Sequence, residues 1–249
     1  MDRSECVRSR DLGARSHPVS SVDPRRIRAV GFDFDHTLGI DNKLERVAFL
    51  RLLDAACERG GHCIGTLAEE IERIDDLLAK QRAGAFTIEE AVRRFMGERG
   101  VTHPEEFVDG YKRMAVNMVR SFVIPQPGVR EMLAELRRRG IAVAILTNGW
   151  SPLQQHKAER VGFDGPVVVS ADLGVQKPEP QAFAALAHAL KADPHEIAFV
   201  GDTPSSDVAG AIRAGMLGVW FDAEGIAYPS DLPPPAEVIH SLAELAALV

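Results

Sequence analysis

The sequence predicts an α/β fold, a doubly wound, Rossmann-like parallel sheet with an all-helical segment inserted into it. Two observations predict this class: short apolar runs alternate with helical patterns along most of the chain, and one long stretch breaks that alternation. Short runs that are apolar on both alternating faces are typical of strands buried on both sides of a parallel sheet. In such a sheet, ligands bind at the carboxyl ends of the strands.

Five runs rich in Val, Ile and Phe are the predicted strands. They cover residues 27–34, 141–147, 167–170, 197–201 and 218–221. Between them, apolar residues at helical spacing predict helices near 129–136 and 183–190. A third helix is expected to begin with Ser205 as its N-cap and to end at Gly215, and a final helix is expected near 241–249.

Residues 41–123 contain no convincing strand. Their apolar residues recur at helical intervals in four groups: Phe49, Leu52, Leu53 and Ala56; Leu67, Ile71, Ile74 and Leu78; Ile88, Val92 and Phe95; and Phe107, Tyr111, Met114 and Met118. We therefore predict an α/β core from 27–40 and 124–249, with 41–123 inserted as a helical subdomain after the first strand. Residues 1–26 carry several arginines but lack the apolar stretch of a secretory signal, so we expect a disordered tail.

Composition limits the classes of partner. The 249 residues are 45% hydrophobic and 26% charged, with a formal net charge of -7. The negative balance argues against a nucleic-acid polymer or an anionic membrane as the main partner. No run approaches the ~18 apolar residues of a membrane span. Three cysteines, Cys6, Cys57 and Cys63, do not suggest a disulfide framework, so a cytoplasmic protein is expected. Its expected assembly is a monomer or a homodimer.

Two aspartates end the first predicted strand. Asp33 and Asp35 are separated by one residue, and side chains at i and i+2 of a strand point the same way. Two carboxylates this close repel each other unless a divalent cation neutralises them. The pair therefore indicates a metal site, and acidic residues in a simple strand-end turn are the alternative.

Three later segments follow predicted strands or the turns after them. Thr147 and Asn148 offer a hydroxyl and a backbone N–H, a small corner that suits an anion. Lys177 offers a point charge to a phosphoryl group. Asp202 and Asp207 come after the fourth strand, and a helix dipole accounts for Asp207 but not for Asp202. Taken singly, each segment could also be an ordinary turn or an exposed charge.

Together, the segments occur in a specific order: DxDxT on the first strand, Thr/Ser on a later strand, then Lys, then GDxxxxD. This order resembles the haloacid dehalogenase superfamily, and in particular its phosphatases with a helical cap inserted after the first motif. The resemblance spans roughly residues 27–249. It implies a Rossmann-like core, a helical cap at 41–123 and Mg²⁺-dependent hydrolysis of a phosphate ester.

The resemblance also implies roles for individual residues. Asp33 would be the nucleophile that forms a phosphoaspartate, and Asp35 the general acid and base. Mg²⁺ would be bound by Asp33, by the backbone carbonyl of Asp35 and by Asp202. The phosphoryl oxygens would be held by Thr147, the Asn148 backbone N–H and Lys177. Asp207 would lie behind these groups and orient a metal-bound water or Lys177.

Two features bear on the reaction type and the substrate. The superfamily's dehalogenases and phosphonate hydrolases lack an aspartate at the position of Asp35, which favours a phosphatase. His36 departs from the family, which usually has a small residue there. It could contact substrate or the cap interface, or simply be tolerated in a loop. Basic residues on the predicted cap could contact the leaving group or line solvated helix faces: Arg46, Lys80, Arg82, Arg93 and Arg94.

The expected substrate is a small phosphorylated metabolite, such as a nucleotide or a sugar phosphate. Two other functions stay open. A phosphomutase of the same superfamily would pass the phosphoryl group to a second substrate instead of water. A non-catalytic binding module would use the same fold without turnover.

Overall fold

The computed structural model describes residues 27–249, so the predicted tail at 1–26 and Cys6 lie outside the described residues. Within this range a six-stranded sheet has the order β5-β4-β1-β6-β7-β8, and all of its pairs are parallel. Its strands are β1 (Ala29–Phe32), β4 (Ala142–Thr147), β5 (Val167–Val169), β6 (Ile197–Gly201), β7 (Leu217–Phe221) and β8 (Glu237–Ile239). The chain proceeds from the central β1 to one edge and then fills the other, which confirms the predicted doubly wound sheet.

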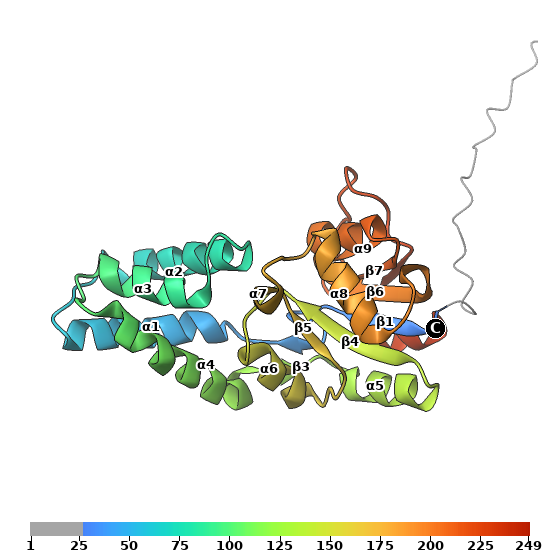
Figure 1. Cartoon of the computed structure of the whole chain (residues 1–249), viewed down its shortest axis with the longest axis horizontal. Helices are drawn as coiled ribbons and strands as arrows, with labels where there is room; N and C mark the ends of the chain where they lie inside the picture. The colour runs from blue at the N-terminus through green and yellow to red at the C-terminus, as the bar shows by residue number, and fades with distance from the viewer. Residues whose placement is uncertain (1–26) are drawn as a thin grey trace, which may run out of the picture.

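Helices cover both faces of this sheet (Figure 1). They are α5 (Val129–Arg138), α6 (Leu153–Val161), α7 (Ser170–Leu173), α8 (Pro180–Leu190) and α9 (Ala209–Arg213), with a 3-10 turn, η3 (Pro194–Glu196), before β6. Successive strand residues join different cores: Val30 packs in the cluster that contains α5 and α6, whereas Ala29 packs in the cluster that contains α8. Gly31 lets α8 come close, because a Cβ there would lie 2.5 Å from Leu186.

A helical part lies beside the carboxyl-end side of the sheet (Figure 1). It contains α1 (Leu44–Glu58), α2 (Leu67–Arg82), α3 (Ile88–Glu98), the 3-10 turn η2 (Pro104–Phe107) and α4 (Val108–Phe122). Thr66 and Thr87 cap α2 and α3 by accepting a hydrogen bond from the backbone N–H three residues later. At the centre, the Phe49 ring lies 5.1 Å from Phe95 and 4.7 Å from Tyr111 between ring centroids.

Two short strands join the helical part to the sheet. β2 (Gly39–Ile40) precedes α1 and β3 (Ile124–Pro125) follows α4, and the two pair antiparallel. The chain therefore leaves the sheet and returns to it along a single two-stranded ribbon. Nothing in the sequence analysis predicted this ribbon, because two-residue strands give no recognisable alternation.

Several local predictions are wrong or incomplete. Ser205 does not cap a helix, because the helical turn begins earlier, at Pro204, in the short π-helix η4 (Pro204–Val208), with Thr203 at the N-cap. Proline suits the first position of a helical turn, since no intrahelical partner is needed for its nitrogen. The C-terminal stretch forms the 3-10 helix η5 (Leu242–Ala247) instead of an α-helix. β8 and α6 were not predicted.

Two further observations concern the whole described range. None of its helices combines the length and the apolar character needed to cross a membrane. Cys57 and Cys63 are exposed thiols whose Sγ atoms lie 3.8 Å apart, without a disulfide bond.

Candidate active site

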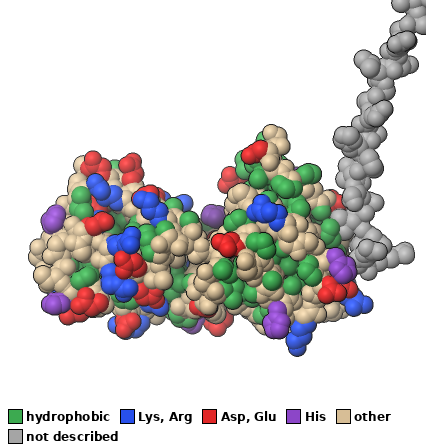
Figure 2. Space-filling view, turned by 45° about the horizontal axis from the view of Figure 1, so that its top comes forward, with side chains coloured by type: hydrophobic (Ala, Val, Ile, Leu, Met, Phe, Trp, Pro, Cys, Tyr) green, Lys and Arg blue, Asp and Glu red, His purple; other side chains and the backbone are tan. Residues whose placement is uncertain are grey.

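A cavity of about 440 Å³ opens between the carboxyl ends of the central strands and the helices α1 and α2. Figure 2 shows the helical part and the sheet part as two lobes with a notch between them. All of the predicted site residues line the cavity on its strand-end side: Asp33, Asp35, Thr147, Asn148, Lys177, Asp202 and Asp207. The opposite side is lined by Lys43, Arg46, Asp75, Leu78, Ala79 and Arg82.

Asp33 is the first residue after β1. Its backbone N–H donates to the carbonyl of Val200 at 2.9 Å, so the pairing of β1 with β6 continues up to this residue. Its carboxylate lies in a buried position, with Oδ1 2.5 Å from Nζ of Lys177. Burial raises the pKa of Asp33 well above its ordinary value; Lys177 opposes this rise, and the charges of Asp207 and Asp202 add to it.

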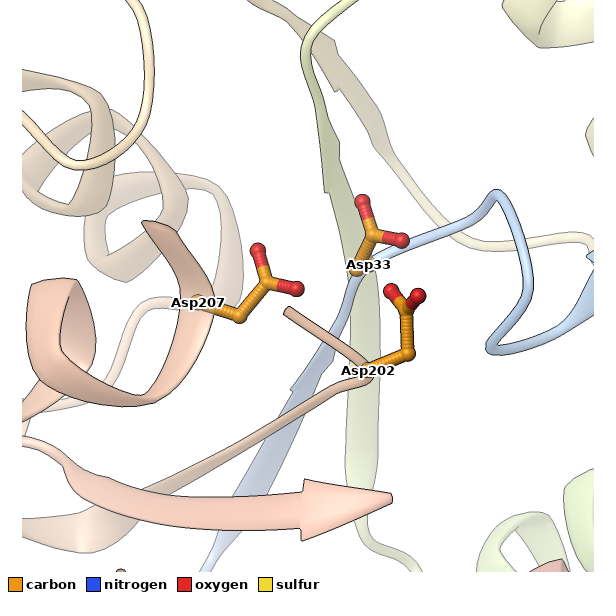
Figure 3. A group of neighbouring side chains, drawn as sticks. All are labelled: Asp33, Asp202 and Asp207. Carbon is orange, nitrogen blue, oxygen red and sulfur yellow. The ribbon is translucent and has the colours of Figure 1, made fainter. Parts of the chain in front are cut away.

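Three carboxylates meet at this point. Asp33, Asp202 and Asp207 each offer one oxygen, and these oxygens lie within 4.8 Å of one another (Figure 3). Burial, and then the charge of Asp207, raise the pKa of Asp202 to about 6. A divalent cation such as Mg²⁺ accepts carboxylate oxygens and would cancel their repulsion, so the donor set fits the metal that the resemblance implies.

Asp207 already has hydrogen-bond partners on both of its oxygens. Oδ1 lies 2.8 Å from Nζ of Lys177, and Oδ2 accepts the Thr203 N–H at 3.0 Å. Glycine is needed at position 201, since a Cβ there would lie 2.4 Å from the Asp207 side chain. Asp207 is therefore placed to hold Lys177, as well as to contribute negative charge to the cluster.

Lys177 is also fixed through its backbone. The Asn148 side chain accepts from the Lys177 N–H at 2.9 Å and donates to the Lys177 carbonyl at 3.0 Å. The sequence predicted a role only for the backbone N–H of Asn148, not for this side-chain contact. Burial acts to lower the pKa of Lys177, but the carboxylates of Asp207 and Asp33 outweigh it and raise the pKa. Thr147 is the buried last residue of β4, beside this pair.

Asp35 has a partner that the sequence analysis missed. Nζ of Lys157, on α6, lies 2.9 Å from Asp35 Oδ1 and 3.2 Å from Asp41 Oδ2. Gln154 Nε2 lies 3.5 Å from Asp35 Oδ2. Burial acts to raise the pKa of Asp35, but the positive charges of Lys157 and Arg82 outweigh it, so the pKa falls below its ordinary value.

The helical side of the cavity carries ion pairs between helices. Arg46 of α1 makes two hydrogen bonds to Asp75 of α2, with Nε 2.6 Å from Oδ1. Nη2 of Arg82 donates to Oε2 of the buried Glu45 at 3.0 Å. The other oxygen of Glu45 accepts the Trp150 indole N–H at 2.8 Å. Of the basic residues predicted on the cap, Arg46 and Arg82 line the cavity. The others pair with acids on the helix surface: Lys80 with Asp76, and Arg93 and Arg94 with Glu90.

His36 lies in the turn between the two aspartates and β2. Its φ of 64° places it in the left-handed region, and its N–H donates to the carbonyl of Gly39 at 2.8 Å. This conformation explains why small residues suit the position. The His36 side chain lines the cavity next to the acidic cluster.

Several known phosphatases are similar to this chain in sequence. The glyceraldehyde 3-phosphate phosphatase of Methanopyrus kandleri is 31% identical over 211 residues, which cover 78% of this chain and 83% of that protein. The pyrimidine 5'-nucleotidase YjjG of Escherichia coli is 35% identical over 52% of this chain and 60% of its own length. The phosphoserine phosphatase of Thermus thermophilus is 42% identical over 39% of this chain and 40% of its own length. The matches to the last two thus span between two fifths and three fifths of those proteins.

A solved structure and a family model point to the same family as these relatives. A 2-haloacid dehalogenase from Pseudomonas syringae superimposes with a TM-score of 0.69 and 26% identity, covering 89% of this chain and 97% of that chain. Residues 27–215 match the model of the haloacid dehalogenase-like hydrolases. The chain therefore belongs to the haloacid dehalogenase-like hydrolase family.

Proposed function

We propose that this protein is a Mg²⁺-dependent phosphomonoesterase that hydrolyses a small phosphorylated metabolite through a phosphoaspartate on Asp33. One observation carries the proposal: the buried Asp33 carboxylate lies against Lys177, inside a cluster with two further carboxylates. A carboxylate nucleophile and a phosphate ester are both anionic, so their reaction requires positive charge of this kind at the nucleophile.

In the first half of the reaction, an oxygen of Asp33 attacks phosphorus and the bond from phosphorus to the leaving oxygen breaks. Protonated Asp35 gives its proton to that oxygen, so the alcohol departs neutral. The incoming phosphate places negative charge near Asp35, which opposes the lowering of its pKa by Lys157 and Arg82.

In the second half, the Asp35 carboxylate takes a proton from a water molecule. The water oxygen attacks phosphorus, the bond between phosphorus and Asp33 breaks, and inorganic phosphate leaves. Asp33 is restored as a carboxylate and Asp35 as an acid, so both are ready for the next turnover.

The phosphoryl oxygens would be held by Lys177, the Thr147 hydroxyl and the Asn148 N–H. Asp33, the Asp35 carbonyl and Asp202 would hold Mg²⁺, which supplies further neutralisation of the phosphate charge when it is bound. Asp207 keeps Lys177 at Asp33, as its 2.8 Å contact with Nζ indicates.

The presence of Asp35 supports a phosphatase over a dehalogenase, because the two reactions release different leaving groups. A halide departs as a stable anion and needs no proton, whereas an alcohol leaving a phosphate ester does, and Asp35 supplies one. The curated relatives from Methanopyrus and Escherichia are named for a sugar-type phosphate and a nucleotide. A cavity of about 440 Å³ suits a substrate of that size.

We also propose that residues 41–123 act as a cap that selects the leaving group. The cavity is lined from this segment by Arg46, Asp75 and Arg82, on the side opposite the aspartates. Closure of such a segment excludes water and completes a site around its substrate.

The proposal is tested by measuring phosphate release from a panel of phosphomonoesters, with Mg²⁺ and with excess chelator. We expect release that needs the metal, is lost in Asp33→Asn and is kept in Asp54→Asn, a matched change at an exposed aspartate of α1. A folded wild-type protein that releases no phosphate from any ester with Mg²⁺ present contradicts the proposal. Adding a second phosphoryl acceptor to the same assay then tests for a phosphomutase.

A further inference from the structure

The proposed reaction assigns no task to Lys157, although this lysine touches the site. Lys157 lies on α6, is completely buried, and has a carboxylate on either side of its ammonium group. A buried ammonium is stable only when its charge is paired and its donors are used. Any ion pair in the core would meet that requirement. The role of Lys157 must therefore be inferred from which two carboxylates it binds.

The first partner, Asp35, is the proposed acid and base. The second, Asp41, is the residue after β2, where the chain enters the helical part. Asp41 organises that point: its carbonyl accepts the Leu44 N–H at 2.9 Å, and its Oδ1 accepts the Lys43 N–H at 3.1 Å. Lys157 therefore links the carboxylate that moves protons to Asp41, which lies three residues before the start of α1.

The two oxygens of Asp35 are held unequally. Lys157 binds Oδ1 at 2.9 Å, whereas Oδ2 has only the 3.5 Å contact with Gln154. Gln154 is buried and lies against Gly149, where a Cβ would come within 2.2 Å of its amide nitrogen. With the backbone at Gly149 keeping Gln154 in place, α6 presents two polar side chains to Asp35 from successive turns.

We propose that Lys157 is a positioning residue that orients Asp35, with Oδ1 engaged and Oδ2 left to exchange its proton with the leaving oxygen and with water. Proton transfer needs the donor within hydrogen-bond reach of the acceptor, and a carboxylate without Lys157 can rotate about its Cα–Cβ and Cβ–Cγ bonds. The assignment rests on the proposed function, because Asp35 has this task only in that reaction.

If Lys157 orients Asp35, its loss should affect esters differently according to their leaving group, which loss of a purely structural ion pair would not do. A nitrophenolate leaves phosphorus without a proton, whereas an alkoxide requires one. The ratio kcat/KM covers the steps up to transfer of the phosphoryl group to Asp33, and so it reports loss of the acid without the later water step. Misorientation of Asp35 should therefore lower kcat/KM for alkyl phosphates much more than for p-nitrophenyl phosphate.

The test compares wild type, Lys157→Met and Glu159→Gln, a control at an exposed position of the same helix. Substrates are p-nitrophenyl phosphate and the alkyl phosphate that wild type hydrolyses best. In Lys157→Met we expect kcat/KM to fall by about 10²-fold for the alkyl ester, the lower end for loss of general acid catalysis, and by less than about 5-fold for the aryl ester. Glu159→Gln should change neither.

Equal losses on both esters, or no loss on either, would overturn the role of Lys157 and leave the proposed function standing. Absence of phosphate release by wild type from both esters contradicts the proposed function itself, and the assignment with it. If Lys157→Met does not fold, Lys157→Arg keeps the buried charge with a different reach. This variant should show a smaller loss with the same bias toward the alkyl ester, and an unbiased loss would again overturn the assignment.

Discussion

The two sides of the cavity are built differently. On the strand-end side, Asp33 and Asp202 follow directly after β1 and β6, and Lys177 is fixed to Asn148 by two hydrogen bonds through its backbone. On the helical side, Arg46 and Arg82 reach the cavity as side chains, each bound to an acid: Arg46 to Asp75 of α2 and Arg82 to Glu45 of α1.

From this difference we expect the strand-end side to carry the chemistry and the helical side to select the substrate. Sheet register sets the positions of the strand-end groups, so they stay in place whatever leaving group is bound. The positions of Arg46 and Arg82 depend on how α1 packs against α2. Substitutions of the strand-end groups that face the phosphoryl group or the metal, such as Lys177, should therefore affect all esters alike. Substitutions on the helical side should change the order of preference among esters.

The largest effect is expected on the strand-end side. Lys177→Met should lower kcat/KM by at least about 10²–10³-fold on every ester, because it removes a positive charge that faces both Asp33 and the phosphoryl group. Steady-state rates on the ester panel measure this, with Lys191→Met as an exposed control. A loss confined to some esters would contradict the claim that Lys177 acts on the phosphoryl group that all esters share.

Mg²⁺ should stabilise the strand-end side measurably. At a concentration 100 times its Kd, the metal should raise the free energy of unfolding by about 2.7 kcal/mol. The increase should vanish in Asp202→Asn, which removes one carboxylate of the cluster, and persist in Asp54→Asn. Thermal unfolding with and without Mg²⁺ measures the shift, and an unchanged increase in Asp202→Asn would speak against the metal site.

A smaller and selective effect is expected on the helical side. Arg82→Met should change kcat/KM for some esters relative to others by about 10-fold, the value of one polar contact of about 1.4 kcal/mol. Inhibition by inorganic phosphate should not change, because phosphate lacks a leaving group. Uniform loss across esters, or weaker phosphate inhibition, would place Arg82 with the catalytic groups.

The smallest effect is expected at the turn between the two sides. Glycine adopts the left-handed conformation of His36 without steric cost, so His36→Gly should change the free energy of unfolding by less than about 1 kcal/mol. If the imidazole does not bind substrate, kcat/KM on the preferred ester should stay within about 3-fold of the wild-type value. Loss of one substrate contact would lower kcat/KM by about 10-fold. A larger and ester-dependent loss would make His36 part of substrate recognition.

The strand-end residues could be predicted because each follows an apolar run. Asp33, Thr147 and Asp202 come at the ends of β1, β4 and β6, and parallel strands bring their carboxyl ends to one edge. A local pattern was therefore enough to bring together residues that lie far apart in sequence.

Lys157 could not be predicted in the same way. It occupies the middle of the stripe formed by Leu153, Lys157 and Val161 at i, i+4 and i+8, which is apolar at its two other positions. The buried lysine and the neighbouring Gln154 hide the amphipathic pattern of α6, so the helix was missed together with its contact to Asp35. A charged residue inside an otherwise apolar stripe was the available signal.

The helical side depends on tertiary packing that a single sequence does not encode locally. Arg46 and Asp75 are 29 positions apart and meet only because α1 and α2 pack together. The helices themselves follow from apolar spacing, but the pairing of their charges does not.

The most direct test is to find where the phosphoryl group resides during turnover. The protein would be mixed with its best ester and Mg²⁺, quenched in acid, digested and mapped by mass spectrometry. We predict one phosphoryl group on Asp33 in wild type and none on the corresponding peptide of Asp33→Asn. A phosphoryl group on another residue, or sustained turnover by Asp33→Asn, would contradict the assignment of Asp33 as the nucleophile.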